Sequence, residues 1–180
     1  MVNTNKKLEE KYKKYLQLAK SGKRFTGDQD PKVLKLHNGE IAYWLAFKSH
    51  KNGWAKTKAA QNFNVLKLHK GEVAYELANK SLKNGWAKTK AAQDLKILKL
   101  FNGEIAYWLA NYSDKNGWAK TKAAQNFKVL SLDNGSIAYW LAYHSNKNGW
   151  GETKAAQDPK VRALYGGEVG EKLEKKVLKK

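Results

Sequence analysis

Lysines recur at a fixed spacing in this chain, and their positive charges are the first candidates for binding a partner. Two lysine columns are invariant at every 32nd residue: Lys51, Lys83, Lys115 and Lys147, and Lys58, Lys90, Lys122 and Lys154. A third column holds Lys56, Lys88 and Lys120 and ends at Glu152. If equivalent residues stack, each column becomes a ladder of charges about 8–10 Å apart. Phosphates along a nucleic-acid strand can meet such ladders without base reading; the alternative is solvated lysines kept by recent duplication.

The overall charge points the same way. The 180 residues include 35 basic and 16 acidic ones, a formal charge of +19, which attracts polyanions. Only Arg24 and Arg162 are arginine, the residue that reads guanine edges, so the lysine bias favours attraction to a backbone. Residues 1–93 carry 20 basic and 7 acidic residues (+13) and residues 94–180 carry 15 and 9 (+6). We therefore expect a polyanion to engage the N-terminal half first.

A second set of candidate binding residues varies between copies. One varied column precedes the expected longer helix: His37, His69, Phe101, Asp133 and Tyr165. Three more lie on its outward side: Trp44, Glu76, Trp108 and Trp140; Phe47, Asn79, Asn111 and Tyr143; and Lys48, Lys80, Tyr112 and His144. Residues three and four apart share a helix face. Free drift of surface positions is the alternative, but exposed tryptophan is uncommon and aromatic residues are frequent binding hot spots.

A further tryptophan column is invariant. Trp54, Trp86, Trp118 and Trp150 each follow a glycine that ends a helix. We expect these rings to pack across the junctions between repeats; the alternative is that they are stacking platforms for nucleotide bases.

Residues arranged for catalysis are missing. There is no cysteine, so disulfides, thiolate zinc sites and cysteine nucleophiles are excluded, and a reducing compartment fits. The four histidines lack the spacing of a metal-binding helix, and no phosphate-loop or serine-hydrolase motif occurs. Glu40, Glu72 and Glu104 fit charges at helix starts rather than an acid–base pair. We expect no enzyme activity, no metal, no cofactor and no small-molecule substrate.

The elements that position these columns follow from the repeat. Four blocks, 30–61, 62–93, 94–125 and 126–157, follow a lead-in and capping helix at 1–29 and precede a partial fifth copy and cap at 158–180. A period of about 20 to 50 residues is typical of solenoids, in which each unit packs on its neighbours. The chain is therefore expected to be all-α, a short solenoid of four helical repeats with a capping helix at each end.

Each block carries its own helix signals. Asp30 followed by Pro31 predicts an N-cap and a short helix to Leu36. Gly39 breaks this helix, and a longer one is expected from Glu40 until Asn52-Gly53, since glycine is the usual C-cap. Residues 57–61 predict a further short helix or a helical lead-in. Amphipathic stretches at 3–20 and 168–180 are suited to cap the stack.

The unit resembles a degenerate ankyrin repeat over residues 30 to about 170. The likeness lies in the period, the Asn-Gly turn, and the pattern Gly39, Ala42, Leu45 and Ala46; the Thr-Pro-Leu-His motif is absent. The resemblance implies a protein-interaction scaffold that binds through its turn tips and first-helix face.

These features lead to one expectation and one alternative. We expect a soluble, cytoplasmic, monomeric scaffold, with neither a secretory signal nor an apolar run of about 20 residues that could cross a membrane. It binds an acidic macromolecule, in the first place nucleic acid, through the lysine ladders and the aromatic outer face. The alternative is a protein–protein interaction module, an adaptor or an inhibitor of the kind a phage or parasite carries, that grips one folded partner through the varied columns.

Overall fold

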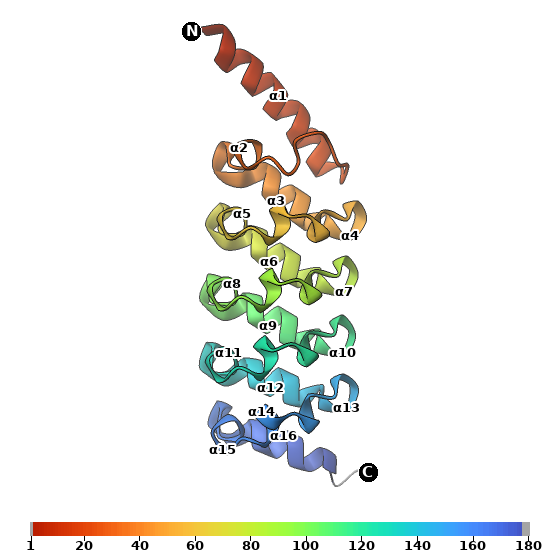
Figure 1. Ribbon diagram of the computed structural model, residues 1–180, viewed down its shortest axis with the longest axis vertical. Helices are drawn as coiled ribbons and strands as arrows, with labels where there is room; N and C mark the ends of the chain where they lie inside the picture. Colours follow the sequence, from red (N-terminus) through yellow and green to blue (C-terminus); the bar gives the residue numbers. More distant parts are fainter. Residues whose placement is uncertain (1, 178–180) are drawn as a thin grey trace.

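The molecule is a straight stack of helical repeats, with its two ends at opposite poles (Figure 1). The computed structural model describes residues 2–177, and within that range every regular element is an α-helix or a 3-10 helix. Corresponding elements of successive repeats lie one below the other along the axis. The expected short α-solenoid is confirmed.

One repeat consists of six short elements. The first holds α2 (Pro31–Leu34), η1 (Leu36–Gly39), α3 (Glu40–Phe47), α4 (Ser49–Asn52), η2 (Trp54–Lys56) and η3 (Ala59–Gln61). The second holds α5 (Phe63–Leu66), η4 (His69–Gly71), α6 (Glu72–Asn79), α7 (Ser81–Asn84), η5 (Trp86–Lys88) and η6 (Ala91–Gln93). The third holds α8 (Leu95–Leu98), η7 (Leu100–Gly103), α9 (Glu104–Asn111), α10 (Ser113–Asn116), η8 (Trp118–Lys120) and η9 (Ala123–Gln125).

The fourth repeat keeps this order, and a partial fifth copy closes the stack. The fourth holds α11 (Phe127–Leu130), η10 (Asp133–Gly135), α12 (Ser136–Tyr143), α13 (Ser145–Asn148), η11 (Trp150–Glu152) and α14 (Lys154–Gln157). The fifth holds α15 (Pro159–Arg162), η12 (Tyr165–Gly167) and α16 (Glu168–Val177). Within residues 57–61, for which a short helix or a helical lead-in was expected, a 3-10 helix forms at Ala59–Gln61, whereas the equivalent stretch of the fourth repeat forms α14.

Two helix boundaries differ from the sequence prediction. The first short helix ends at Leu34 instead of Leu36, and the longer helix is interrupted at Lys48. The amide of Asn52 donates a hydrogen bond to the carbonyl of Leu45, 3.1 Å away. In an uninterrupted α-helix this carbonyl would accept a hydrogen bond from the backbone N–H of Ser49, four residues later. The Asn52 side chain acts as the donor instead. The same bond recurs in every repeat: Asn84 to Leu77, Asn116 to Leu109 and Asn148 to Leu141.

The turn before each longer helix is left-handed. His37, Asn38 and Gly39 have φ angles of 45°, 56° and 94°. Glycine is required at the third position for a second reason: a Cβ on Gly39 would lie 2.5 Å from the Cβ of Leu68 in the next repeat. A Cβ on Gly135 would likewise lie 2.9 Å from the Cβ of Leu164, so these two glycines allow successive repeats to approach closely, whereas a Cβ on Gly71 would meet only ordinary contacts.

The longer helices form the central row of the stack. They pack in the order α1 (Val2–Lys20), α3, α6, α9, α12, α16, so the terminal helices cap the row as expected. Their inward side is buried, at Ile41, Ala42, Leu45 and Ala46 in the first repeat. Paired alanines permit close helix contact. The expected end of the last helix, 178–180, lies outside the described residues.

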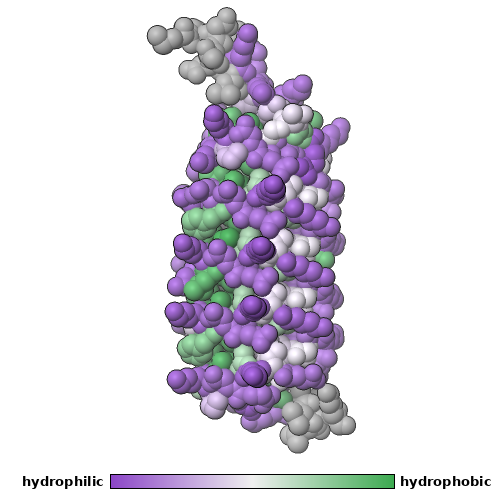
Figure 2. Space-filling model, viewed as in Figure 1, coloured by the Kyte–Doolittle hydropathy of each residue, from purple (hydrophilic) through white to green (hydrophobic). Residues whose placement is uncertain are grey.

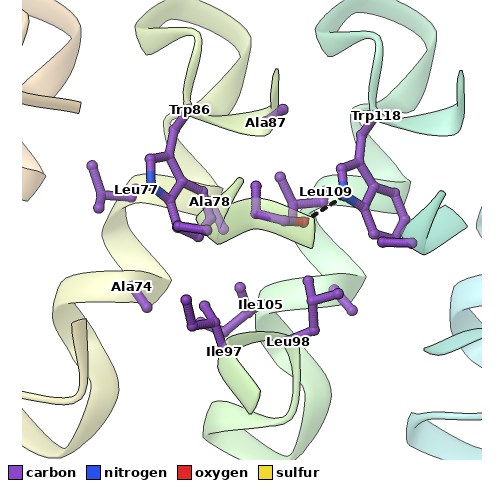
Figure 3. Close-up of a cluster of buried hydrophobic side chains, with 14 of the residues drawn as sticks. Ala74, Leu77, Ala78, Trp86, Ala87, Ile97, Leu98, Ile105, Leu109 and Trp118 are labelled. Atoms are coloured by element: carbon purple, nitrogen blue, oxygen red, sulfur yellow. Dashed lines mark hydrogen bonds between the residues drawn. The ribbon is translucent and has the colours of Figure 1, made fainter. Parts of the chain in front are cut away.

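The invariant tryptophans join one repeat to the preceding one. All four indoles are completely buried, and that of Trp118 donates a 2.9 Å hydrogen bond to the carbonyl of Ala92 (Figure 3). The others donate to Asp28, Ala60 and Ala124. The packing interpretation is confirmed, and burial leaves no ring face for a nucleotide base.

A buried polar ladder runs beside these rings. The side-chain amide of Asn116 donates to the hydroxyl of Ser81 in the preceding repeat. The side-chain oxygen of Asn116 accepts a hydrogen bond from the backbone N–H of Trp118. Asn84 and Asn148 repeat both bonds, with Ser49 and Ser113. The Asn-Gly-Trp motif is therefore both a helix end and a joint between repeats. Among the described helices, none combines the length and apolar character needed to cross a bilayer.

Candidate binding faces

The short helices α2, α5, α8, α11 and α15, together with the short segments that follow each buried tryptophan, form one long face, which we call the 3-10 face. In Figure 1 these segments lie in front of the row of longer helices. The lysine column on this face is exposed throughout: Lys58, Lys90, Lys122 and Lys154. Figure 2 shows the same side covered by hydrophilic side chains, in rows that recur with the repeats, with apolar patches over α5, α8 and α11. A straight row of cations is thus freely accessible.

A second exposed lysine row follows the C-terminal ends of the longer helices. Lys51, Lys83, Lys115 and Lys147 lie on α4, α7, α10 and α13, which also pack on one another in order. In the first two repeats Lys48 and Lys80 join this row. Burial, followed by the charges of Lys51, Lys80, Lys83 and Lys48, lowers the pKa of His50 among them. The N-terminal half therefore holds the densest cationic cluster of these rows.

The apolar patches on the 3-10 face come from a column that the sequence reading passed over. It contains Pro31, Phe63, Leu95, Phe127 and Pro159, each directly after the N-cap of a short helix. The rings of Phe63 and Phe127 are 37% and 45% exposed. The first turn of a helix does not need an aromatic ring. The two phenylalanines, at a position that holds proline in the first and last copies, were therefore the signal in the sequence that could have marked this column.

The outward side of the longer helices forms a second surface, which we call the aromatic face. The rings of its varied turn column pack against a tyrosine of the preceding element, stacked at His37 and His69 and tilted at Phe101 and Tyr165. The ring centroids of His69 and Tyr43 are 5.0 Å apart, and those of Phe101 and Tyr75 are 5.4 Å apart. His37 packs against Tyr12 and Tyr165 against Tyr139. At the fourth turn Asp133 instead accepts a hydrogen bond from Ser136.

The tryptophans of this face engage neighbouring rings. Trp108 and Trp140 meet Tyr75 and Tyr107 of the preceding repeats edge to face. The remaining predicted aromatic residues extend the cluster: Trp44 contacts Phe47, Trp108 stacks with Tyr112, and Trp140 contacts Tyr143. These tryptophans are half-buried instead of freely exposed. Much of their apolar surface is already used inside the molecule.

The chain's own cations also cover this face. The amine of Lys20 lies 5.4 Å from the ring centre of Trp44, and Lys48 and Lys80 both lie over Phe47. Lys20 forms an ion pair with Glu40, which also accepts a hydrogen bond from the hydroxyl of Tyr12. That hydroxyl, more than the lysine, lowers the pKa of Glu40. Glu40 thus ties the capping helix α1 to the first repeat.

Glu76 interrupts the tryptophan column. Outward exposure was expected for it, but the side chain is buried between the neighbouring repeats, with a relative exposure of 8% for the residue. One carboxylate oxygen has no hydrogen-bond partner, and Lys80 is 4.0 Å away. Burial raises the pKa of Glu76. The Glu76 side chain is shorter than the indole found at this position in the other repeats, so it stays within the surface that the neighbouring repeats cover.

The predicted site residues therefore separate into groups. The aromatic columns, the turn column and Lys48 and Lys80 lie together, whereas the Lys58 column lies on the 3-10 face, across the buried side of the longer helices. One flat partner cannot contact both groups. Within residues 2–177, no three histidine, aspartate or glutamate side chains gather as metal ligands. Comparison with models of protein families, with curated proteins and with solved structures finds no match to this chain.

Proposed function

We propose that this protein is a non-catalytic scaffold that binds nucleic acid along its lysine rows. The observation that supports this most directly is the straight, exposed Lys58 column on one face of a molecule with a charge of +19. Phosphates meeting these rungs release condensed counterions, so the attraction needs no base recognition. The denser lysines near His50 make the first two repeats the expected point of first contact.

Salt dependence tests this proposal. Affinity for fluorescein-labelled DNA and RNA is measured by anisotropy over a range of salt concentrations. For duplex DNA the logarithm of the affinity falls with the logarithm of salt by about 0.9 for each phosphate contact. A flat response would contradict the proposal.

Matched lysine variants locate the contact. Replacement of Lys58, Lys90 and Lys122 by glutamine is expected to lower the slope by about two to three units, because three contacts are lost. A control with the same loss of charge replaces Lys11, Lys13 and Lys14, exposed on α1. Equal losses in both variants would show attraction by net charge alone, with no binding face.

A second candidate function is supported by the aromatic face. The turn column keeps a left-handed backbone in all five copies, although its residues range from His37 to Phe101 to Asp133. Side-chain choice there does not serve the turn, since asparagine or glycine would cost less. We infer that a protein-interaction scaffold of the ankyrin-like kind would use this column to hold one folded partner.

Capture from a lysate with and without nuclease separates the two functions. A stoichiometric protein partner that survives nuclease treatment and is lost on Phe101→Ser or Tyr143→Ser would favour the aromatic face. Both residues are exposed, at 37% and 47%, so their loss leaves the core intact. Loss of all captured material with nuclease would favour nucleic acid.

A further inference from the structure

We propose that the 3-10 face binds a single strand and that Phe63 and Phe127 are its base-stacking platforms. This rests on the proposed binding of nucleic acid and narrows its class. Base-stacking on exposed rings beside a basic track is the usual way of holding a strand without sequence preference. Three observations on the 3-10 face carry the inference: the straightness of the stack, the freedom of the two rings, and the cations around them.

The straight stack favours a single strand over a duplex. Equivalent residues lie one below the other along the axis, without visible winding (Figure 1). The four rungs from Lys58 to Lys154 are three repeats apart from end to end, roughly 24–30 Å at 8–10 Å per packed repeat. A duplex backbone winds through most of a turn over that length, since one turn takes about 34 Å. It would leave a straight column after a few phosphates, whereas a single strand can be drawn along it.

The two phenylalanines are free to stack, unlike the other exposed rings. Phe101 and Tyr165 already lie against Tyr75 and Tyr139, and Tyr143 lies against Trp140. Within residues 2–177, neither Phe63 nor Phe127 has a neighbouring aromatic ring. Both follow an asparagine whose side chain caps a short helix, so their backbone is held in place. Stacking of a base there therefore costs the protein little conformational entropy.

Lysines lie near both rings along the chain, and one of them covers the ring of Phe63. Lys58 precedes Phe63 by five residues, and the amine of Lys67 lies 5.6 Å from its ring centre. Lys122 and Lys128 stand beside Phe127 in the chain, and both are exposed. At the equivalent of Lys67 the fourth repeat has Ser131, so no cation covers the ring of Phe127. Phe127 is therefore the more open platform, and Lys67 is placed to meet the phosphate of a base on Phe63.

The rings alternate with residues that cannot stack. Leu95 stands between them, and Pro31 and Pro159 occupy the column at the two ends. The platforms are two repeats apart, roughly 16–20 Å. A strand would thus stack bases at two points and be held between them by phosphate contacts. This arrangement predicts binding without sequence preference.

The test compares three labelled probes on the intact chain: an oligothymidylate long enough to span the stack, an abasic strand of the same length, and a duplex of the same length. The abasic strand keeps the phosphates and removes the bases. Wild-type protein is expected to bind thymidylate about a hundredfold more tightly than the abasic strand, about tenfold for each ring, which corresponds to about 1.4 kcal/mol per ring.

The Phe63→Ala/Phe127→Ala double variant is expected to lose most of that preference while its affinity for the abasic strand stays unchanged. Phe101→Ala is the matched control, because its ring has the same 37% exposure as Phe63 but lies on the aromatic face. Leu95→Ala controls for loss of apolar surface within the column. Both controls should keep the wild-type preference, and thermal unfolding confirms that all variants remain folded.

The outcomes separate this inference from the function on which it rests. Equal, salt-dependent binding of the thymidylate and abasic strands would overturn the stacking platforms and leave nucleic-acid binding in place. Duplex binding as tight as thymidylate binding would overturn the single-strand preference. Salt-independent or absent binding of all three probes would overturn both the inference and the proposed function.

Discussion

Two rows of tryptophan in this molecule have the same spacing and different roles. The inner row, with Trp118 as an example, is invariant, completely buried, and hydrogen-bonded to the preceding repeat. The outer row, with Trp108 as an example, is half-buried, lies edge to face against tyrosines, and is broken at Glu76. The difference teaches that invariance combined with burial marks the joints of a repeat array. Sites for partners are to be sought where equivalent residues stay exposed or change from copy to copy.

Replacing one tryptophan of each row by alanine should give the largest difference in stability between the two rows. Trp118→Ala is expected to lower the free energy of unfolding by about 3–5 kcal/mol, because it leaves a large cavity and removes an inter-repeat bond. Trp108→Ala should cost roughly 1–2 kcal/mol, since the half-buried ring can be replaced by water. Urea unfolding followed by circular dichroism measures both; similar losses would erase the distinction between the rows.

Loss of the buried asparagine hydrogen bonds at the same joint should give the second-largest change in the free energy of unfolding. Asn116→Ala removes bonds to Ser81 and Leu109 and leaves the N–H of Trp118 without an acceptor. A loss of roughly 2–3 kcal/mol is expected, the cost of buried groups left unpaired. Asn111→Ala, on the half-buried outer side of α9, is the control and should be near neutral. A neutral Asn116→Ala would mean that the ring alone joins the repeats.

The interruption of the outer row should give a smaller, pH-dependent effect. Burial raises the pKa of Glu76 above its unfolded value, so the folded chain holds this proton more tightly than the unfolded chain does. Its contribution to stability is therefore present at low pH and is lost as pH rises through the two pKa values. Glu76→Gln should raise the melting temperature by roughly 2–4 °C near neutral pH and by less near pH 4.

The exposed Glu104→Gln variant is the control for this experiment. A Glu76→Gln advantage that does not change between acidic and neutral solution would contradict a buried carboxylate as its cause.

Fluorescence quenching gives the smallest signal and sharpens the comparison without mutation. Of the seven tryptophans, four are completely buried. Acrylamide added to the folded protein should therefore quench a component of about three-sevenths of the emission, and the remainder should respond only after denaturation. Quenching of all the emission at one rate would show that the inner row opens readily.

Much of this architecture could be predicted from the sequence because local signals repeat in register. The cap at Asp30, the break at Gly39 and the packing of Trp54 follow from residue type and spacing alone. The interruption at Lys48 could not be predicted, because it depends on where the Asn52 side chain folds back. Burial of Glu76 depends on the neighbouring repeats.

The binding residues were harder to predict than the fold. Periodicity groups Lys58 and Trp44 in columns, but only the path of the 3-10 segments decides that these columns lie on different sides. Phe63 was missed because its position looks like the first turn of a helix, where Pro31 serves equally well. Position in a helix says little about exposure when the helix has four residues.

The indole bonds give the assembly a direction. Every tryptophan after the first donates backward to a carbonyl of the repeat made before it, and the asparagine amides donate backward to a serine hydroxyl of that repeat. During synthesis each new unit thus meets acceptors that are already folded. Shortening the array from its C-terminal end leaves only acceptors without partners at this joint, the carbonyl and serine oxygens, whereas removal of leading units leaves buried donors without partners, the costlier defect. An array joined in this way can be lengthened by duplication at its trailing end while the earlier joints stay unchanged.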